Sequence, residues 1–273
     1  MELCVSTFIC YKESLTELLP VFAKSGVKNL ELWGAFSFGS ELHFPYWKPG
    51  FIETFQKVLV QNGLQANTLH APFSEILDLS TRNERHRIAA VEEVKRAANI
   101  FRKLPEAKTV IVHPGGFITN PDREKERLNQ SRKSITELAS FLSGLKLNLA
   151  VENMLPELIA WTYSDLEFLT EGLPNTGICL DTGHAFISGN LKELIREFGE
   201  NIITYHISDT FDSQDRHLLP YEGSVDWDYF KKTALDNKEP ALLTFETRTR
   251  GELKKALKEV TSSFRRLNGD NLN

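Results

Sequence analysis

The stretch Phe8-Ile9-Cys10-Tyr11-Lys12 follows the first apolar run of the chain and contains no glycine. In a doubly wound α/β fold, this position usually carries a glycine-rich turn that binds phosphate. The lack of such a turn favours the other architecture in which strands and helices alternate, the TIM barrel. Outward from this stretch, eight short apolar or β-branched runs are each followed by a segment with helical periodicity. We therefore predict an α/β fold with a parallel sheet, a single (β/α)8 TIM barrel.

The predicted elements alternate along almost the whole chain. Strands are predicted at residues 3–9, 29–33, 65–70, 109–113, 148–152, 176–181, 202–206 and 241–246. The helices that follow them are predicted at residues 14–25, 51–62, 84–103, 122–142, 164–171, 191–198, 227–235 and 252–267. Residues 1–267 then form one barrel domain, and residues 268–273 form a flexible polar tail.

The composition is that of an ordinary globular protein. The chain has 273 residues, of which 41% are hydrophobic and 25% charged, so it can bury a large core. Its net charge of -5 argues against general binding to nucleic acid or to anionic membranes. The three cysteines form no CxxC pair, which is typical of a reduced, intracellular protein. Since no signal peptide or membrane-spanning run is evident, we expect a cytoplasmic protein.

Six consecutive predicted strands end in a histidine or an acidic residue. The C-terminal ends of barrel strands meet at one rim, where the active sites of this architecture lie. A single such group is usually a hydrogen-bonded core residue or a helix N-cap, as Asp181 before Thr182 could be. Six of them at one rim would bury several charges with nothing to neutralise them, which predicts a bound cation. With three residues that follow the strands, the side chains expected to converge are His70, His113, Glu152, Asp181, His184, His206, Asp215, His217 and Glu246.

The donor atoms of these residues divide into two groups. The oxygen-rich set of Glu152, Asp181, His206 and Glu246 suits Mn²⁺ or Mg²⁺, with Co²⁺ or Zn²⁺ as alternatives. The other five residues are mostly imidazoles, which suit zinc and could hold further ions. We expect one divalent metal ion at the first set and allow for up to three in all.

Five motifs resemble the xylose isomerase-like TIM-barrel superfamily. They are LHAPF at 69–73, VHPGG at 112–116, VENM at 151–154, CLDTGHA at 179–185 and DRHLLPYEGSVDW at 215–227. The resemblance extends from Leu3 to about Arg266. The superfamily contains sugar and sugar-phosphate isomerases and epimerases, the inosose dehydratase and isomerase group, and endonuclease IV.

The resemblance to the single-metal epimerases implies a metal-dependent sugar or sugar-phosphate isomerase or epimerase. The metal ligands of those epimerases match Glu152, Asp181, His206 and Glu246 of this chain. In that branch the two glutamates also carry the protons, and transfer occurs α to a carbonyl through a metal-stabilised enediolate. His184 and Arg216 resemble its substrate contacts.

Aromatic side chains near the rim complete the expected substrate site. We expect Trp33, Phe8 and the aromatic loop at residues 36–47 to pack on the apolar face of a sugar. Plain packing or an oligomer contact is the alternative for this loop. The expected partner is a small-molecule sugar or sugar phosphate, and a homo-oligomer stays open.

The resemblance to endonuclease IV implies a second hypothesis, a multi-zinc phosphodiesterase that cleaves abasic DNA. All nine ligand types of that enzyme have counterparts here. However, Lys12 and Lys48 are nearly the only basic residues in the loops after the first three strands, which argues against nucleic acid as a partner. A third hypothesis, a non-catalytic metal-binding sensor barrel, is disfavoured because both proton-transfer carboxylates are present.

Overall fold

Eight parallel strands form a closed barrel, and the order around the barrel is β1 to β8. The structure is a computed structural model, and it describes residues 1–34, 40–118, 124–235, 242–248 and 251–269. The strands are β1 (Glu2–Ser6), β2 (Asn29–Trp33), β3 (Gln65–His70), β4 (Thr109–Val112), β5 (Asn148–Glu152), β6 (Thr176–Asp181), β7 (Ile202–Ile207) and β8 (Leu242–Phe245). The pairing of β1 with β8 closes the barrel, and the predicted (β/α)8 architecture is confirmed.

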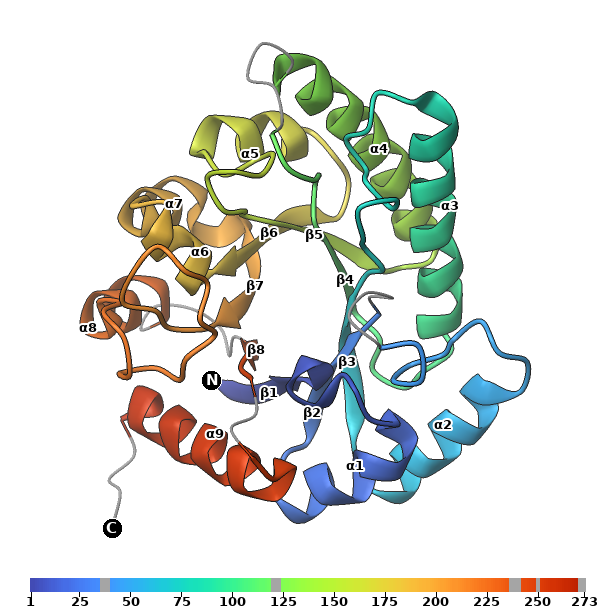
Figure 1. The fold of residues 1–273 in the computed structure, drawn as a ribbon, viewed down its shortest axis with the longest axis vertical. Coiled ribbons are helices and arrows are strands. Elements are labelled where there is room, and N and C mark those ends of the chain that lie inside the picture. The colour runs from blue at the N-terminus through green and yellow to red at the C-terminus, as the bar shows by residue number, and fades with distance from the viewer. Residues whose placement is uncertain (35–39, 119–123, 236–241, 249–250, 270–273) are drawn as a thin grey trace.

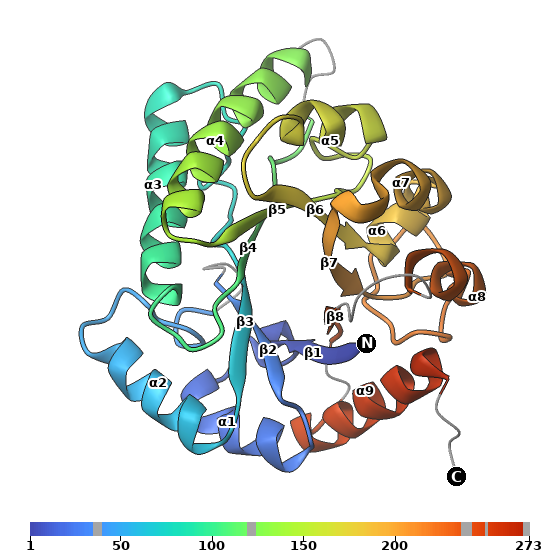
Figure 2. The same ribbon diagram turned by 180° about the vertical axis from the view of Figure 1, so that it is seen from behind.

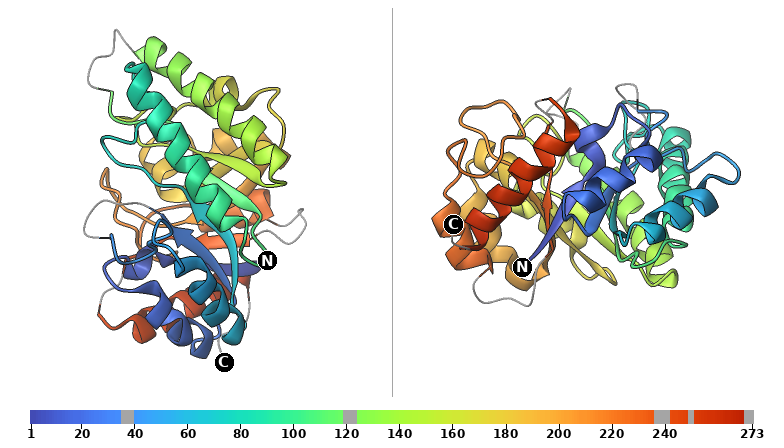
Figure 3. Two further views of the ribbon diagram at one scale, coloured as in Figure 1. Left: turned by 90° about the vertical axis from the view of Figure 1, so that its right-hand side faces the viewer. Right: turned by 90° about the horizontal axis from the view of Figure 1, so that it is seen from below.

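Helices surround this ring of strands, as the two end views show (Figure 1, Figure 2). They are α1 (Leu15–Lys24), α2 (Phe51–Gln61), α3 (Glu84–Phe101), α4 (Glu124–Gly144), α5 (Tyr163–Thr170), α6 (Thr182–Ile187), α7 (Leu191–Phe198), α8 (Trp227–Phe230) and α9 (Leu253–Asn268). The views from the side and from below show the helices packed along the outside of the strands (Figure 3). None of the helices in the described ranges is long and apolar enough to cross a membrane.

The apolar pattern of the strands follows from burial on both faces. One large cluster of buried aliphatic and aromatic side chains fills the space between the strands and the helices. A small second cluster of Ile111, Ala150 and Cys179 lies apart from it, on three neighbouring strands. The Cys179 side chain is fully buried, and this burial raises the pKa of its thiol.

The start of the chain differs from the prediction. The strand predicted at 3–9 ends at Ser6, and residues Thr7–Cys10 form a 3-10 turn, η1. The Thr7 hydroxyl accepts a hydrogen bond from the backbone N–H of Trp33 at 2.9 Å, which ties the turn to the end of β2. The turn stacks Phe8 on Tyr11. Periodicity could not reveal this turn, because its residues are as apolar as those of a strand.

Three further differences concern the helices. The short helix α6, which begins at Thr182, was not predicted, and a 3-10 turn, η3 (Gly199–Asn201), follows α7. The helix predicted at 227–235 divides into α8 and a π-helical turn, η4 (Lys231–Leu235). Residues 122–123 of a predicted helix and residues 270–273 of the predicted tail lie outside the described residues, while Asn268 belongs to α9.

The buried ring of His43 makes the stability of the barrel sensitive to pH. Only 1% of the residue is exposed, and burial lowers its pKa from 6.5 to about 4. Between these values an unfolded chain binds a proton that the folded chain excludes, so the free energy of unfolding falls as pH drops from 6.5 to about 4. The expected loss from this residue is roughly 2–4 kcal/mol.

Chemical denaturation at pH 7 and pH 4.5 measures this contribution. We expect His43→Gln to lose much less stability on acidification than the wild type. His86→Gln is the matched control because its ring is exposed on α3, and it should follow the wild type. Identical pH dependence in all three proteins would contradict the assignment.

Candidate metal centre

The nine predicted ligands lie at the C-terminal rim of the barrel or in the segments that follow it. His70, Glu152 and Asp181 end β3, β5 and β6, and His206 is the penultimate residue of β7. His113 and Glu246 directly follow β4 and β8. The remaining three come from α6 and from the loop after β7: His184, Asp215 and His217. The parallel barrel therefore brings together groups that are up to 176 residues apart in the chain, as the numbers of His70 and Glu246 show.

Four of these residues form a buried cluster with one imidazole and three carboxylates. Atoms of Glu152, Asp181, His206 and Glu246 that could ligate a metal lie within 4.8 Å of one another. The Nδ1 atom of His206 is 3.2 Å from Glu152 Oε1, 3.0 Å from Glu246 Oε2 and 3.9 Å from Asp181 Oδ2. These are the four residues predicted as the first set, and the structure brings all of them together.

Glu152 also belongs to a second group with two imidazoles. The Oε2 atom of Glu152 is 3.4 Å from His70 Nε2 and 3.3 Å from His113 Nε2, and these three atoms too lie within 4.8 Å of one another. One carboxylate therefore connects both groups, which is the geometry of a ligand that could be shared by two ions.

The loop after β7 closes the site with a third group. His184 Nε2 lies 3.7 Å from Asp215 Oδ2, and His217 Nε2 lies 2.7 Å from the same oxygen. His184 connects this third group to the first, because its Nδ1 atom is 3.5 Å from Glu152 Oε1. All nine predicted residues thus form one connected constellation.

Hydrogen bonds orient most of the imidazoles in the same way. Nδ1 of His70, His184 and His217 lies 3.3, 2.9 and 3.1 Å from the backbone carbonyl oxygens of Ala71, Asn153 and Glu246. A carbonyl oxygen only accepts, so Nδ1 carries the proton and Nε2 is turned toward the carboxylates. His206 is reversed, because its Nδ1 faces the cluster and its Nε2 faces Glu31 at 3.2 Å.

The two oxygens of Asp181 have different surroundings. Oδ1 accepts a hydrogen bond of 2.7 Å from the backbone N–H of His184 and caps α6, as the N-cap alternative for this residue implied. Oδ2 is buried and has no hydrogen-bond partner within the described residues. The cap therefore aims the second oxygen at the cluster.

Mutual electrostatics compensate the buried charges. Burial alone would raise the pKa of Glu152, but His206 and His113 hold it well below 4.5. Burial opposes protonation of His206, yet neighbouring carboxylates, Glu31 and Glu246 among them, raise its pKa well above 6.5. Burial together with Glu152 raises the pKa of Asp181 to about 6. The imidazole of His206 and the carboxylate of Glu152 therefore stabilise each other's charged forms.

The donor set fits a divalent ion. Glu152 Oε2, Asp181 Oδ2 and Asp215 Oδ1 are buried carboxylate oxygens without a hydrogen-bond partner in the described ranges. Leaving such oxygens unpaired is costly, and an ion that they ligate removes this cost. Mixed oxygen and imidazole donors suit Mn²⁺, Co²⁺ and Zn²⁺ better than an ion that prefers oxygen alone.

Aromatic rings line the β1–β3 side of the constellation. The ring centroid of Phe8 is 5.2 Å from that of Trp33 and 5.1 Å from that of His217. Phe73, which was not predicted, packs 4.1 Å from His113 and 6.2 Å from Trp33. Phe8 thus lies beside the candidate ligand His217, and Trp33 is the strand neighbour of His70 in the register of β2 and β3.

The aromatic loop after β2 contributes to packing where it is described. Phe44 and Tyr46 are both 3% exposed, and Phe44 packs against Phe51 and Phe55 of α2. This outcome matches the packing alternative for these two side chains. Residues 36–39 of the loop lie outside the described residues.

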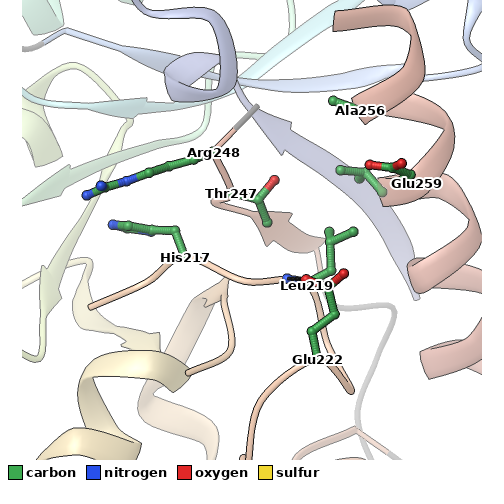
Figure 4. Close-up of a pocket in the computed structure, with 8 residues that line it drawn as sticks. His217, Leu219, Glu222, Thr247, Arg248, Ala256 and Glu259 are labelled. Carbon is green, nitrogen blue, oxygen red and sulfur yellow. Dashed lines mark hydrogen bonds between the residues drawn. The ribbon is translucent and has the colours of Figure 1, made fainter. Parts of the chain in front are cut away.

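Two arginines near the site have different contacts. Arg216 donates a hydrogen bond of 2.9 Å from Nε to Asp212 and lies 4.4 Å above the Phe211 ring, so its described partners are outside the constellation. Arg248 and His217 line a small hollow beside α9, and their side chains extend from it in the same direction (Figure 4). The Arg248 guanidinium lies 5.9 Å from the ring of Phe8.

Two buried carboxylates that support the site were missed at the sequence level. Glu31 lies inside the barrel on β2 and is fully buried. A charged residue in a strand that is buried on both faces was the signal for it. Asp209, also fully buried, accepts hydrogen bonds from the backbone N–H groups of Tyr221, Gly223 and Val225. Nothing in the sequence distinguishes Asp209 from an ordinary loop residue.

Comparison with known proteins agrees with this fold. Residues 19–267 match the xylose isomerase-like TIM barrel family, so the chain belongs to that family. A relative in Methanocaldococcus jannaschii, the uncharacterized protein MJ1614, is 29% identical over 235 residues, which cover 85% of this chain and 87% of the relative. A probable endonuclease 4 of Campylobacter concisus is 27% identical over 149 residues, 51% of this chain and 50% of that protein.

Solved structures share the fold over nearly the whole chain. A D-tagatose 3-epimerase-like protein superposes with a TM-score of 0.79 at 22% identity, and the match covers 98% of this chain and 99% of that one. The IolI protein with a bound zinc atom superposes with a TM-score of 0.81 at 18% identity, covering 98% of both chains. At these identities the likeness establishes the architecture.

Proposed function

We propose that the protein is a metal-dependent sugar or sugar-phosphate isomerase or epimerase. The observation that carries this proposal is the buried cluster of Glu152, Asp181, His206 and Glu246, which joins a metal-ligand set to two candidate proton-transfer carboxylates. A divalent ion held by these residues would polarise a substrate carbonyl oxygen. The names of the epimerase-like protein and of the zinc-containing IolI protein support this proposal.

The two glutamates differ in their surroundings, and we assign them different parts in proton transfer. Glu152 lies within 3.5 Å of four imidazoles and its side chain is 1% exposed. Glu246 contacts His206 and its side chain is 8% exposed. Glu246 is therefore better placed to take the proton α to the carbonyl, and Glu152 to return one on the other side of the substrate.

The surrounding side chains provide the substrate contacts in this proposal. His184 would hold a sugar hydroxyl, and Phe8 and Trp33 would pack on the apolar face of the ring. Arg216 keeps its predicted role as a substrate contact only if it leaves Asp212. The described contacts make Arg248 the better placed arginine, since its guanidinium lies over Phe8 beside His217.

Two cations at the mouth favour an anionic substrate within this class. Lys12 Nζ is 5.5 Å from the Tyr11 ring. Tyr11 stacks on Phe8, and the Arg248 guanidinium lies over the ring of Phe8. Neither cation has an acidic partner within the described residues, whereas Arg127 and Arg216 at the same rim are paired with Asp78 and Asp212. A sugar phosphate would supply the missing negative charge.

The endonuclease IV-like phosphodiesterase is the second candidate because all nine of its ligand types converge here. The two groups that share Glu152 would suit more than one ion. The likeness to the probable endonuclease 4 covers only half of each chain. A metal-binding sensor without turnover is the third candidate. It would bind the ions and catalyse no reaction.

Two assays on one metal-loaded sample test these candidates. We expect solvent deuterium to enter the carbon α to the carbonyl in members of a panel of ketoses and ketose phosphates, with no nicking of an abasic duplex. A nuclease that binds DNA through several phosphate contacts would also lose about 10³- to 10⁵-fold in DNA affinity between 50 and 200 mM salt. Zinc-dependent nicking without deuterium uptake would establish the phosphodiesterase, and metal binding with neither activity would establish the sensor.

A further inference from the structure

The interior of the barrel below the candidate metal centre contains an unusual buried charge. Glu31 lies in the middle of β2 and is fully buried, although neither a lysine nor an arginine contacts it in the described ranges. Its Oε2 atom is 3.2 Å from His206 Nε2 and 3.0 Å from the Thr68 hydroxyl, which donates to it. Its Oε1 atom is buried and has no hydrogen-bond partner within the described residues.

We propose that Glu31 is a positioning residue, which orients the imidazole of His206 and keeps the His206 Nδ1 atom available as a metal ligand. This inference rests on the proposed metal centre. A carboxylate accepts the proton on Nε2, and an imidazole that carries its proton on Nε2 presents a lone pair at Nδ1. Carboxylates behind histidine ligands commonly fix the ring in this way and increase its basicity.

The other imidazoles explain why His206 needs such a partner. His70, His184 and His217 each donate from Nδ1 to a backbone carbonyl near the rim, and they present Nε2. His206 presents Nδ1, so its Nε2 points across the barrel interior toward β2. Glu31 supplies the acceptor there, and the Thr68 hydroxyl on the adjacent strand β3 holds the same carboxylate oxygen.

Metal affinity measured by competition with a chromophoric chelator tests the role of Glu31. We expect Glu31→Leu to weaken binding of Mn²⁺ and Zn²⁺ by about 10- to 100-fold, the usual effect of losing a partner behind a ligand. Glu31→Gln retains an oxygen that can accept the Nε2 proton, so it should restore part of the affinity. Thr68→Val should weaken binding in the same direction and by less.

Thr204→Val is the matched control for Thr68→Val. Thr204 is buried on β7, and its hydroxyl has no hydrogen-bond partner in the described part of the chain. The same substitution there should leave the metal affinity unchanged. Equal losses in both threonine variants would indicate general damage to the barrel and would overturn the specific role of Glu31.

A spectroscopic measurement separates positioning from a merely structural role. In zinc-loaded wild-type protein, long-range ¹H–¹⁵N correlation should show His206 protonated at Nε2 only. In Glu31→Leu we expect His206 to populate the other tautomer or to exchange between ring states, and in Glu31→Gln to keep the wild-type pattern.

The outcomes distinguish this inference from the proposed function. Wild-type affinity and an unchanged His206 signal in Glu31→Leu, together with metal loss in Glu246→Gln, would overturn the role of Glu31 and leave the metal centre intact. A wild-type protein that binds no divalent ion at the constellation would overturn both.

Discussion

Glu246→Gln is expected to lower the rate of proton exchange by about 10²- to 10⁴-fold, the usual contribution of one general acid or base. A neutral amide cannot take the proton, and its oxygen is a weaker metal ligand than a carboxylate. The His70, His113 and Glu152 group does not include Glu246, so some metal should remain bound in this variant. Glu152→Gln should lose more metal, because Glu152 belongs to both groups.

Metal content per chain and deuterium exchange, measured on the same samples, test this pair of variants. Glu92→Gln is the matched control, because the Glu92 side chain is 62% exposed on the outer helix α3 and pairs with Lys95. It should bind metal and exchange deuterium as the wild type does. Full metal content and full exchange in Glu246→Gln would contradict the assignment of this residue.

Asp209→Ala is expected to destabilise the protein by about 3 kcal/mol or more, since each buried donor left without a partner costs about 1–3 kcal/mol. Asp209 Oδ1 accepts from the N–H groups of Thr210 and Val225, at 2.8 and 3.1 Å. Its Oδ2 accepts from two more backbone N–H groups and from the Trp227 indole at 2.8 Å. One carboxylate thus holds the loop that carries Asp215 and His217.

Two measurements check this prediction. Chemical denaturation should show the loss of stability, and the metal content should fall because Asp215 and His217 lose their fixed positions. Asp228→Ala is the control, since Asp228 is exposed on α8 in the same region, and its effect should stay within about 0.5 kcal/mol. A variant of Asp209 with wild-type stability and metal content would show that the loop holds its shape without this carboxylate.

The barrel and the six candidate residues at its strand ends could be predicted because both depend on simple patterns. Alternation of apolar strands with periodic helices defines the fold, and polar residues at strand ends must share a rim. The assignment of individual histidine nitrogens could not be predicted, since it depends on which carbonyl or carboxylate each ring faces. His206 illustrates this limit, because only the structure reveals its contact with Glu31, 175 residues away in the chain.

Local geometry also decided where the predictions were wrong. The run after Ser6 is apolar enough for a strand, yet Thr7 binds the backbone of Trp33 and the chain turns. Asp181 was expected as a ligand or a helix cap, and the structure shows that Oδ1 caps α6 while Oδ2 has no hydrogen-bond partner within the described residues. The roles of the aromatic residues and arginines stay predictions, because they depend on a bound substrate.

The position of Glu246 directly after β8 has a consequence for biosynthesis. A ribosome produces the chain from its N-terminus, so His70 through His206 are all synthesised before the last carboxylate of the four-residue cluster exists. β8 must also pair with β1, through contacts such as Leu3 with Leu243, before Glu246 reaches its place. A metal that binds only this finished arrangement would slow the opening of the seam between the first and last strands, and would do little to hasten its closure.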